Sequence, residues 1–143
     1  MRTRTLSRSG QRGFTLLEII IVAAIIAILA TVVAVNFMGE PDKARVARAK
    51  QDVASLVSAL QLYKLDNFSY PSTQQGLDAL KTRPSGSPAA PNWKPYVTQM
   101  PSDPWGRPYQ YLNPGQHGEF DVYSYGADGQ PGGEGLGADI GNW

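Results

Sequence analysis

The sequence predicts an α+β protein in which one long N-terminal helix packs on a small antiparallel β-sheet. Three observations predict this fold class. Residues 19–38 contain no charged side chain, and residues 43–65 continue with the apolar spacing of an amphipathic helix. Ten of the eleven prolines lie from Pro71 onward, so the rest of the chain should consist of short elements joined by turns.

The chain opens with a basic leader, residues 1–13, which contains four arginines and no acid and ends at Gly13. Its positive charge should keep the leader on the cytoplasmic side of a membrane. A secretory signal peptide has its cleavage site behind a shorter apolar region. Here a glycine precedes the apolar run, so we expect a cleaved leader of another kind.

The apolar run from Ile19 to Met38 is about as long as a bilayer-spanning helix requires, roughly 20 residues. We therefore predict a membrane-spanning helix over residues 14–38, crossing the membrane once, with residues 39–143 facing outward. A plain signal anchor is the simpler interpretation of the same run.

Glu18 is the one carboxylate at the start of this run. An acid near the centre of a membrane helix costs about 2.5–3.5 kcal/mol, and less near an interface. One interpretation places Glu18 at the depth of the lipid headgroups. The other is that cleavage after Gly13 gives Phe14 a new amino group, which Glu18 neutralises four residues on or in a neighbouring subunit. Such a pair would select the register of an assembly.

Charge and composition exclude several classes of function. Thirteen basic residues less the four in the leader leave nine against twelve acids, and such a mildly acidic chain does not predict a nucleic-acid partner. There is no cysteine, and His117 is the single histidine. Neither a zinc site nor a histidine-based catalytic pair is predicted, so we do not expect an enzyme.

Behind the apolar run, the breakers Gly39 and Pro41 predict a kink, with Asp42 as the cap of the next helix. The amphipathic segment at 43–65 should bury one face on its own domain. That face comprises Val46, Val53, Leu56, Val57, Leu60 and Tyr63.

The remaining elements are short. The sequence predicts a helix at 72–83 with Leu77 and Leu80 inward, followed by a proline-rich loop at 84–95. Trp105, in the turn at 100–106, is a candidate core anchor. Two aromatic-rich strands, at 107–112 and 119–125, should pair across the turn at 113–118.

The tail, residues 126–143, holds seven glycines and three acids, Asp128, Glu134 and Asp139, with no Lys or Arg. Ordering so flexible a segment is entropically costly. Carboxylates and carbonyls in such a loop suit calcium, which takes six to eight oxygen ligands, although the spacing is not that of an EF-hand. A disordered or simply packed acidic loop is the alternative.

The segment Gly13-Phe14-Thr15-Leu16-Leu17-Glu18 resembles the prepilin signature of type IV pilins and type II secretion pseudopilins. The resemblance implies a type IV pilin-like fold. It also implies that a prepilin peptidase cleaves after Gly13 and methylates Phe14, and that Glu18 pairs with the N-terminus of a neighbouring subunit during assembly.

The stretch from Gly13 to Trp143, essentially the mature chain, resembles the major pseudopilins of type II secretion, the general secretion pathway protein G family. The motifs that resemble it are Tyr70-Pro71, Asp103-Pro104-Trp105-Gly106, Asn113-Pro114-Gly115, Asp128-Gly129 and Asp139-Ile140. The resemblance implies a calcium ion held by Asp128 and Asp139. Further acids common in the family are missing here, so Glu134, carbonyls or water would complete the ligand set.

The resemblance also implies a function and its partners. The chain would be the major structural subunit of a helical homopolymer, anchored in the inner membrane before assembly, with a periplasmic domain. Its partners would be further copies, minor pseudopilins, the prepilin peptidase and an inner-membrane assembly platform. Growth of the fibre would drive folded proteins across the outer membrane. The alternative is a type IV major pilin for adhesion or motility, and the missing cysteines and acidic tail argue against it.

Overall fold

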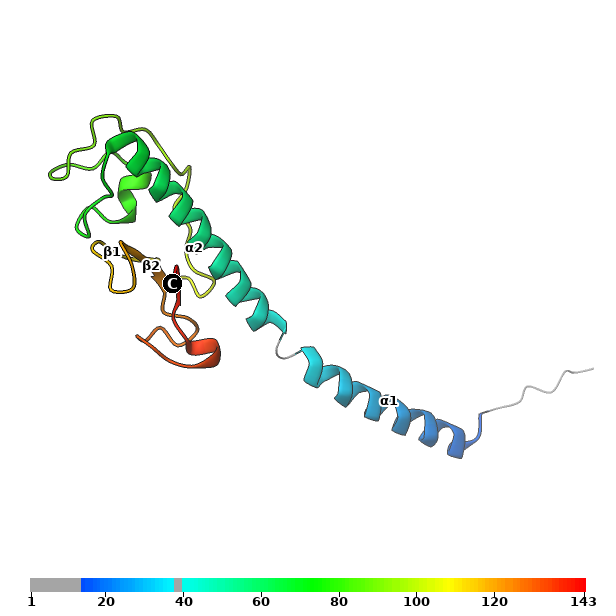
Figure 1. Cartoon of the computed structure of the whole chain (residues 1–143). Coiled ribbons are helices and arrows are strands. Elements are labelled where there is room, and N and C mark those ends of the chain that lie inside the picture. Colours follow the sequence, from blue (N-terminus) through cyan, green and yellow to red (C-terminus); the bar gives the residue numbers. More distant parts are fainter. Residues whose placement is uncertain (1–13, 38–39) are drawn as a thin grey trace, which may run out of the picture. The chain divides into compact units, whose positions relative to one another are not determined.

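The computed structural model describes residues 14–37 and 40–143, which fall into two units divided between residues 39 and 40 (Figure 1). Each unit is described by itself. The predicted leader, including Gly13, and the predicted kink residue Gly39 lie outside the described residues.

The first unit contains helix α1, Leu16–Phe37. Thr15 starts it, because the Glu18 N–H donates to both the carbonyl oxygen and the Oγ1 of Thr15, at 3.0 and 3.2 Å. The described side chains of this unit, at 14–29, are all exposed. No helix among the described residues is long and apolar enough to cross a membrane. The membrane span expected at 14–38 stays a prediction.

Helix α2, Glu40–Asn67, confirms the amphipathic prediction. Its buried face supplies Val53, Leu56, Leu60 and Tyr63 to the core, while Val46 and Val57 are half-buried. The expected cap at Asp42 is wrong. Pro41 and Asp42 lie inside the first turn, where proline is tolerated because the backbone N–H groups there have no helical partner. Asp42 instead pairs with Arg45 at 2.8 Å.

The helix predicted at 72–83 is confined to one 3₁₀ turn, η1, Leu77–Leu80, although Leu77 and Leu80 are buried as expected. Trp105 is not the core anchor that the sequence predicted, since it is half-buried and lies beside Arg107. Trp93 packs against the core instead, and its indole N–H donates to the Ala79 carbonyl at 2.7 Å.

The sheet has three antiparallel strands in the order β1-β2-β3. Strands β1, Gln110–Leu112, and β2, Asp121–Ser124, fall within the two predicted strands and pair with Tyr111 opposite Val122. The third strand, β3, Ile140–Gly141, comes from the tail and was not predicted. A second 3₁₀ turn, η2, Gly135–Gly137, precedes it.

Two tyrosines of the β1 region fix the sheet to the helix and the turn behind it. Tyr109 donates its hydroxyl to Asp52 of α2 at 3.0 Å, and Tyr111 donates to the Pro71 carbonyl at 2.9 Å. The core of the unit therefore lies between α2, η1 and the sheet, and the loop at 126–139 projects from the end of β2 (Figure 1).

Candidate functional site

Helix α1 presents an apolar groove that includes one carboxylate. Residues spaced by three and four positions share a helix face, so these side chains form one stripe. They enclose an open hollow of about 390 Å³ and comprise Phe14, Glu18, Ile19, Val22, Ala23 and Ile26.

Glu18 lies one helical turn beyond Phe14 and is the only charged residue of α1. Its backbone N–H is bound by Thr15, so the helix begins just before it. A carboxylate in an exposed apolar stripe is costly to bury unless a cation meets it. The arrangement can thus select a partner that brings a positive charge to this end of the helix.

The C-terminal loop folds back on itself around Asp128 and Asp139. Asp128 accepts from the Gln130 N–H through Oδ1, and Asp139 accepts from the Gly132 N–H through Oδ2, both at 2.9 Å. The Asp139 N–H also donates to the Gly132 carbonyl at 3.0 Å. One carboxylate oxygen, Asp139 Oδ1, is buried with no hydrogen-bond partner in the described part of the chain.

Two further oxygens converge beside Gly133. A Cβ atom added there would lie 2.4 Å from the Gly137 carbonyl oxygen and 3.1 Å from Asp128 Oδ2, so only glycine leaves this space open. A carboxylate oxygen and a carbonyl oxygen facing one small space suit a hard cation. The unpartnered Asp139 oxygen fits the same kind of ligand.

The three predicted metal-binding residues do not form one carboxylate cluster. Within residues 14–37 and 40–143, no group of three or more His, Cys, Asp or Glu side chains could hold a metal ion. Glu134 is exposed on the N-terminal side of η2. A cation here would therefore need backbone carbonyls in addition to Asp128 and Asp139.

A hollow of about 220 Å³ beside the loop has acidic walls, and Asp121, Asp139 and Tyr123 are among its lining residues. Burial raises the pKa of Tyr123 to about 12, with the Tyr125 hydroxyl and the charges of Asp139 and Asp121 acting in the same direction. Burial, the largest cause, disfavours the charged phenolate, and the neighbouring carboxylates add to this effect. The raised pKa keeps the Tyr123 hydroxyl protonated beside the two acids.

A buried group that sequence reasoning missed holds the start of the loop. Arg107 donates to the Gly126 carbonyl, and its guanidinium lies 3.4 Å from the buried Asp103. Asp103 also accepts the Ser124 hydroxyl at 2.6 Å. The Asp103 motif was noticed in the sequence, but its connection to a loop more than twenty residues away depends on the fold.

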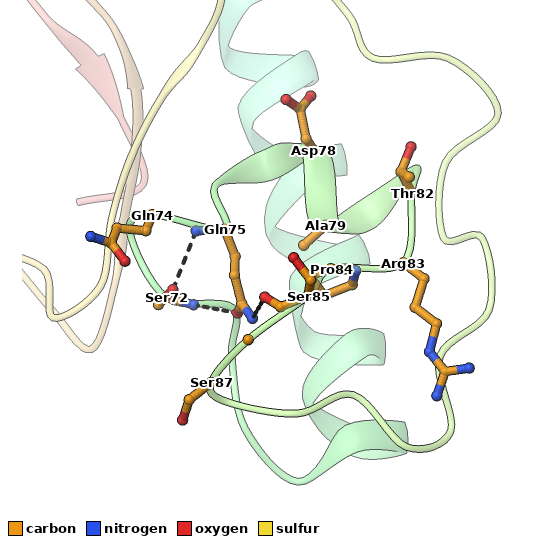
Figure 2. A pocket seen from close by; sticks show the side chains of 11 residues that line it. Ser72, Gln74, Gln75, Asp78, Ala79, Thr82, Arg83, Pro84, Ser85 and Ser87 are labelled. Carbon is orange, nitrogen blue, oxygen red and sulfur yellow. Dashed lines mark hydrogen bonds between the residues drawn. The ribbon is translucent and has the colours of Figure 1, made fainter.

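Figure 2 shows a third hollow, of about 450 Å³, between η1 and the loop that follows it. Gln75 fixes this loop by donating to the Ser85 and Pro88 carbonyls at 3.1 and 2.9 Å. Asp78 and Arg83 project away from one another in this view. Because the charged groups do not converge on the hollow, we assign no site to it.

Comparison with known families finds two matches, one to residues 8–34 and one to residues 36–143. The family described as type II secretion system (T2SS), protein G, matches residues 36–143. The prokaryotic N-terminal methylation motif matches residues 8–34, which include Gly13, Phe14 and Glu18.

Similar proteins agree with these matches. The chain is 54% identical to the type II secretion system core protein G of Pseudomonas aeruginosa over 140 residues, covering 96% of this chain and 99% of that protein. It is 52% identical to the core protein G of Vibrio cholerae, covering 93% and 92%. The crystal structure of the major pseudopilin of enterohaemorrhagic Escherichia coli superposes with a TM-score of 0.67 at 45% identity, over 75% of this chain and 89% of that one.

Proposed function

This chain belongs to the protein G family of type II secretion systems, the major pseudopilins, and we propose that its copies polymerise into a helical fibre after residues 1–13 are removed. The observation that supports this proposal most directly is the exposed apolar stripe of α1, with its single carboxylate at the N-terminal end. Such a surface is stable in water only when other apolar groups cover it.

Processing prepares the end of this helix. We propose that the prepilin peptidase cleaves after Gly13 and methylates the new amino group of Phe14, as the N-terminal methylation motif supports. The Phe14 amine would then pair with Glu18 of a neighbouring subunit. At about 4 Å and an effective dielectric of about 20, such a pair attracts by about 4 kcal/mol. Only the correct register brings the two charges together.

Before assembly, the subunit is proposed to reside in the inner membrane as a single-pass protein. The uncharged sequence from Ile19 to Met38 and the basic leader support this location. Residues 14–38 would form the core of the fibre, and residues 39–143 the periplasmic domain around it. An inner-membrane platform would add subunits, and minor pseudopilins would share the fibre.

Calcium is proposed as the cofactor of the C-terminal loop, held by Asp128, Asp139 and backbone carbonyls such as that of Gly137. When bound, the ion would neutralise the acids and cross-link a loop rich in glycine. The open space at Gly133 and the unpartnered oxygen of Asp139 support this assignment. Glu134 is a further candidate ligand.

The proposed role of the fibre is to drive folded proteins from the periplasm across the outer membrane. The test is secretion in a strain that lacks this gene, with exported enzymes assayed in the periplasm and the medium and with cells inspected for surface pili. We expect folded enzymes to be trapped in the periplasm while surface pili persist. Normal secretion with loss of pili or twitching would instead identify a type IV pilin.

A further inference from the structure

The C-terminal end of α2 exposes an apolar patch that its own domain does not use. Leu62, Leu65 and Phe68, here called the Phe68 patch, are 54%, 75% and 79% exposed. Leu62 and Leu65 lie three positions apart on α2 and Phe68 follows three residues later, just past the helix end, so the three lie close together. Core residues of the same helix, such as Leu60 and Tyr63, are fully buried.

Phe68 is also held in an unfavourable backbone conformation. Its φ is +67°, and it is the only non-glycine residue with positive φ among the described residues. The neighbouring Asn67 is held in place, because its buried amide donates to the Tyr63 carbonyl and the Tyr96 hydroxyl and accepts from the Asn92 N–H. A positive φ is unfavourable for a bulky residue, and because the Phe68 ring is exposed, no burial within its own chain offsets that cost.

The other exposed large apolar residues of the second unit lie in its tail. Among residues 41–143 these are Leu136 and Trp143. Leu136 lies in η2, which packs near α2. Figure 1 shows the loop that contains η2 beside the first half of α2, whereas the Phe68 patch is at the opposite end of that helix. The domain thus has apolar surface at two separate ends.

The two ends also differ in charge. The tail, residues 126–143, has three acids and no basic residue, whereas residues 81–94 have three basic residues and no acid. Residues 81–94 lie against the end of α2, since Asn92 bonds Asn67 and Lys94 pairs with Asp66 at 2.9 Å. Because Asp66 neutralises Lys94, the excess positive charge of this segment comes from Lys81 and Arg83, whereas Leu136 lies in the acidic tail.

We propose that the Phe68 patch of one subunit docks on the C-terminal loop around Leu136 of a second copy of this chain. The contact joins two different surfaces, so it repeats from copy to copy, and it extends a filament when the rotation between copies does not close a ring. The inference rests on the proposed polymerisation and deepens it, because it assigns a contact between the domains in addition to the contact of the α1 helices.

Disulfide trapping tests this contact in the full-length protein, because the chain contains no cysteine of its own. The variants are Leu65→Cys, Leu136→Cys and both together, produced in cells that secrete. We expect a ladder of covalent oligomers from the double variant and none from either single variant. The matched control is Ser55→Cys with Leu136→Cys, which places the thiol at an exposed polar position of the same helix and should give no ladder.

Two outcomes would overturn the inference. A covalent dimer from Leu65→Cys alone would mean that the patch meets itself, and fibres without a ladder in the double variant would mean that the two surfaces do not meet. If the wild-type chain formed no fibre at all, the proposed polymerisation would fail instead, and electron microscopy of the same cells distinguishes that case.

A Phe68→Gly variant separates docking from a structural role. Glycine relaxes the positive φ, so the melting temperature of the full-length chain in detergent should stay the same or rise. Fibre yield should nevertheless fall at least about tenfold, since a buried aromatic anchor is lost from the interface. Phe68→Met keeps an apolar side chain and should retain more fibre. Wild-type fibre yield from Phe68→Gly would contradict the proposal.

Discussion

Helices α1 and α2 are both regular α-helices, but they differ in how much of their side-chain surface is buried. All described side chains of the α1 unit, including eleven bulky apolar residues from Phe14 to Leu29, are exposed within their own chain. Helix α2 buries one face on η1 and the sheet, and apart from Leu62 and Leu65 its exposed face is mainly polar or carries small side chains. Both satisfy their backbone groups internally, so the difference lies in what covers the side chains. The second helix folds a domain, and the first needs another molecule or a lipid.

The largest expected effect on stability comes from truncating one apolar side chain in each helix and comparing the two variants. Leu60→Ala, at a fully buried position of α2, should lower the free energy of unfolding by about 2–5 kcal/mol. Ile25→Ala, at a half-exposed position of α1, should leave it unchanged and reduce assembly. All three tryptophans lie in residues 40–143, so tryptophan fluorescence during denaturation in detergent reports on the domain alone. Equal destabilisation by both variants would contradict the comparison.

The next effect concerns the charge that distinguishes the start of α1. Glu18→Ala removes an attraction of about 4 kcal/mol across the proposed interface and should abolish detectable fibres. Its processing should persist, because cleavage occurs at Gly13, and the control is a gel-mobility shift that depends on the peptidase. Glu18→Asp keeps the charge and should restore part of the yield. Normal polymerisation of Glu18→Ala would disprove the role of the carboxylate.

Calcium should stabilise the second unit and not the first. At a concentration about a hundredfold above its dissociation constant, a bound ligand adds about 2.7 kcal/mol to the free energy of unfolding. Chelation should therefore lower the melting temperature of the full-length chain. Asp128→Asn and Asp139→Asn should remove this dependence, while Glu134→Gln tests the third candidate ligand. If chelation leaves the melting temperature unchanged, the proposal that the loop binds calcium is wrong.

The smallest effect concerns Asp121, which is buried beneath the turn at 113–118. Burial alone would raise its pKa, but the N–H groups of Gln116 and His117 and the His117 ring outweigh this and lower the pKa. Because the folded-state pKa is lowered, the carboxylate stabilises the fold above its unfolded-state pKa, and this stability is lost as the pH falls through the folded-state pKa.

Asp121→Asn should therefore cost about 1–3 kcal/mol at pH 7. The difference from wild type should narrow below about pH 4, where the unfolded carboxyl is protonated. Denaturation at both pH values measures this, and a difference that does not depend on pH would show that the charge contributes nothing. The described residues of the α1 unit include no such buried acid. Titration of Asp121 should therefore change the stability of the second unit and leave that of helix α1 unchanged.

The sequence by itself determined the elements whose signal is local. The amphipathic period identified α2, the prolines and glycines marked where regular structure stops, and the motif from Gly13 to Glu18 indicated the family. These predictions depend on spacing along the chain, and spacing is visible before folding.

Only the tertiary structure decided the features that join distant residues. Strand β3 exists because Ile140 and Gly141 pair with β2, a contact that the short, glycine-rich tail does not signal. Trp93, and not Trp105, packs against the core, where the Ala79 carbonyl accepts a hydrogen bond from its indole. Asn67, the residue before the left-handed turn at Phe68, is bound by Tyr96 and Asn92, contacts that form only when segments some twenty-five residues apart meet.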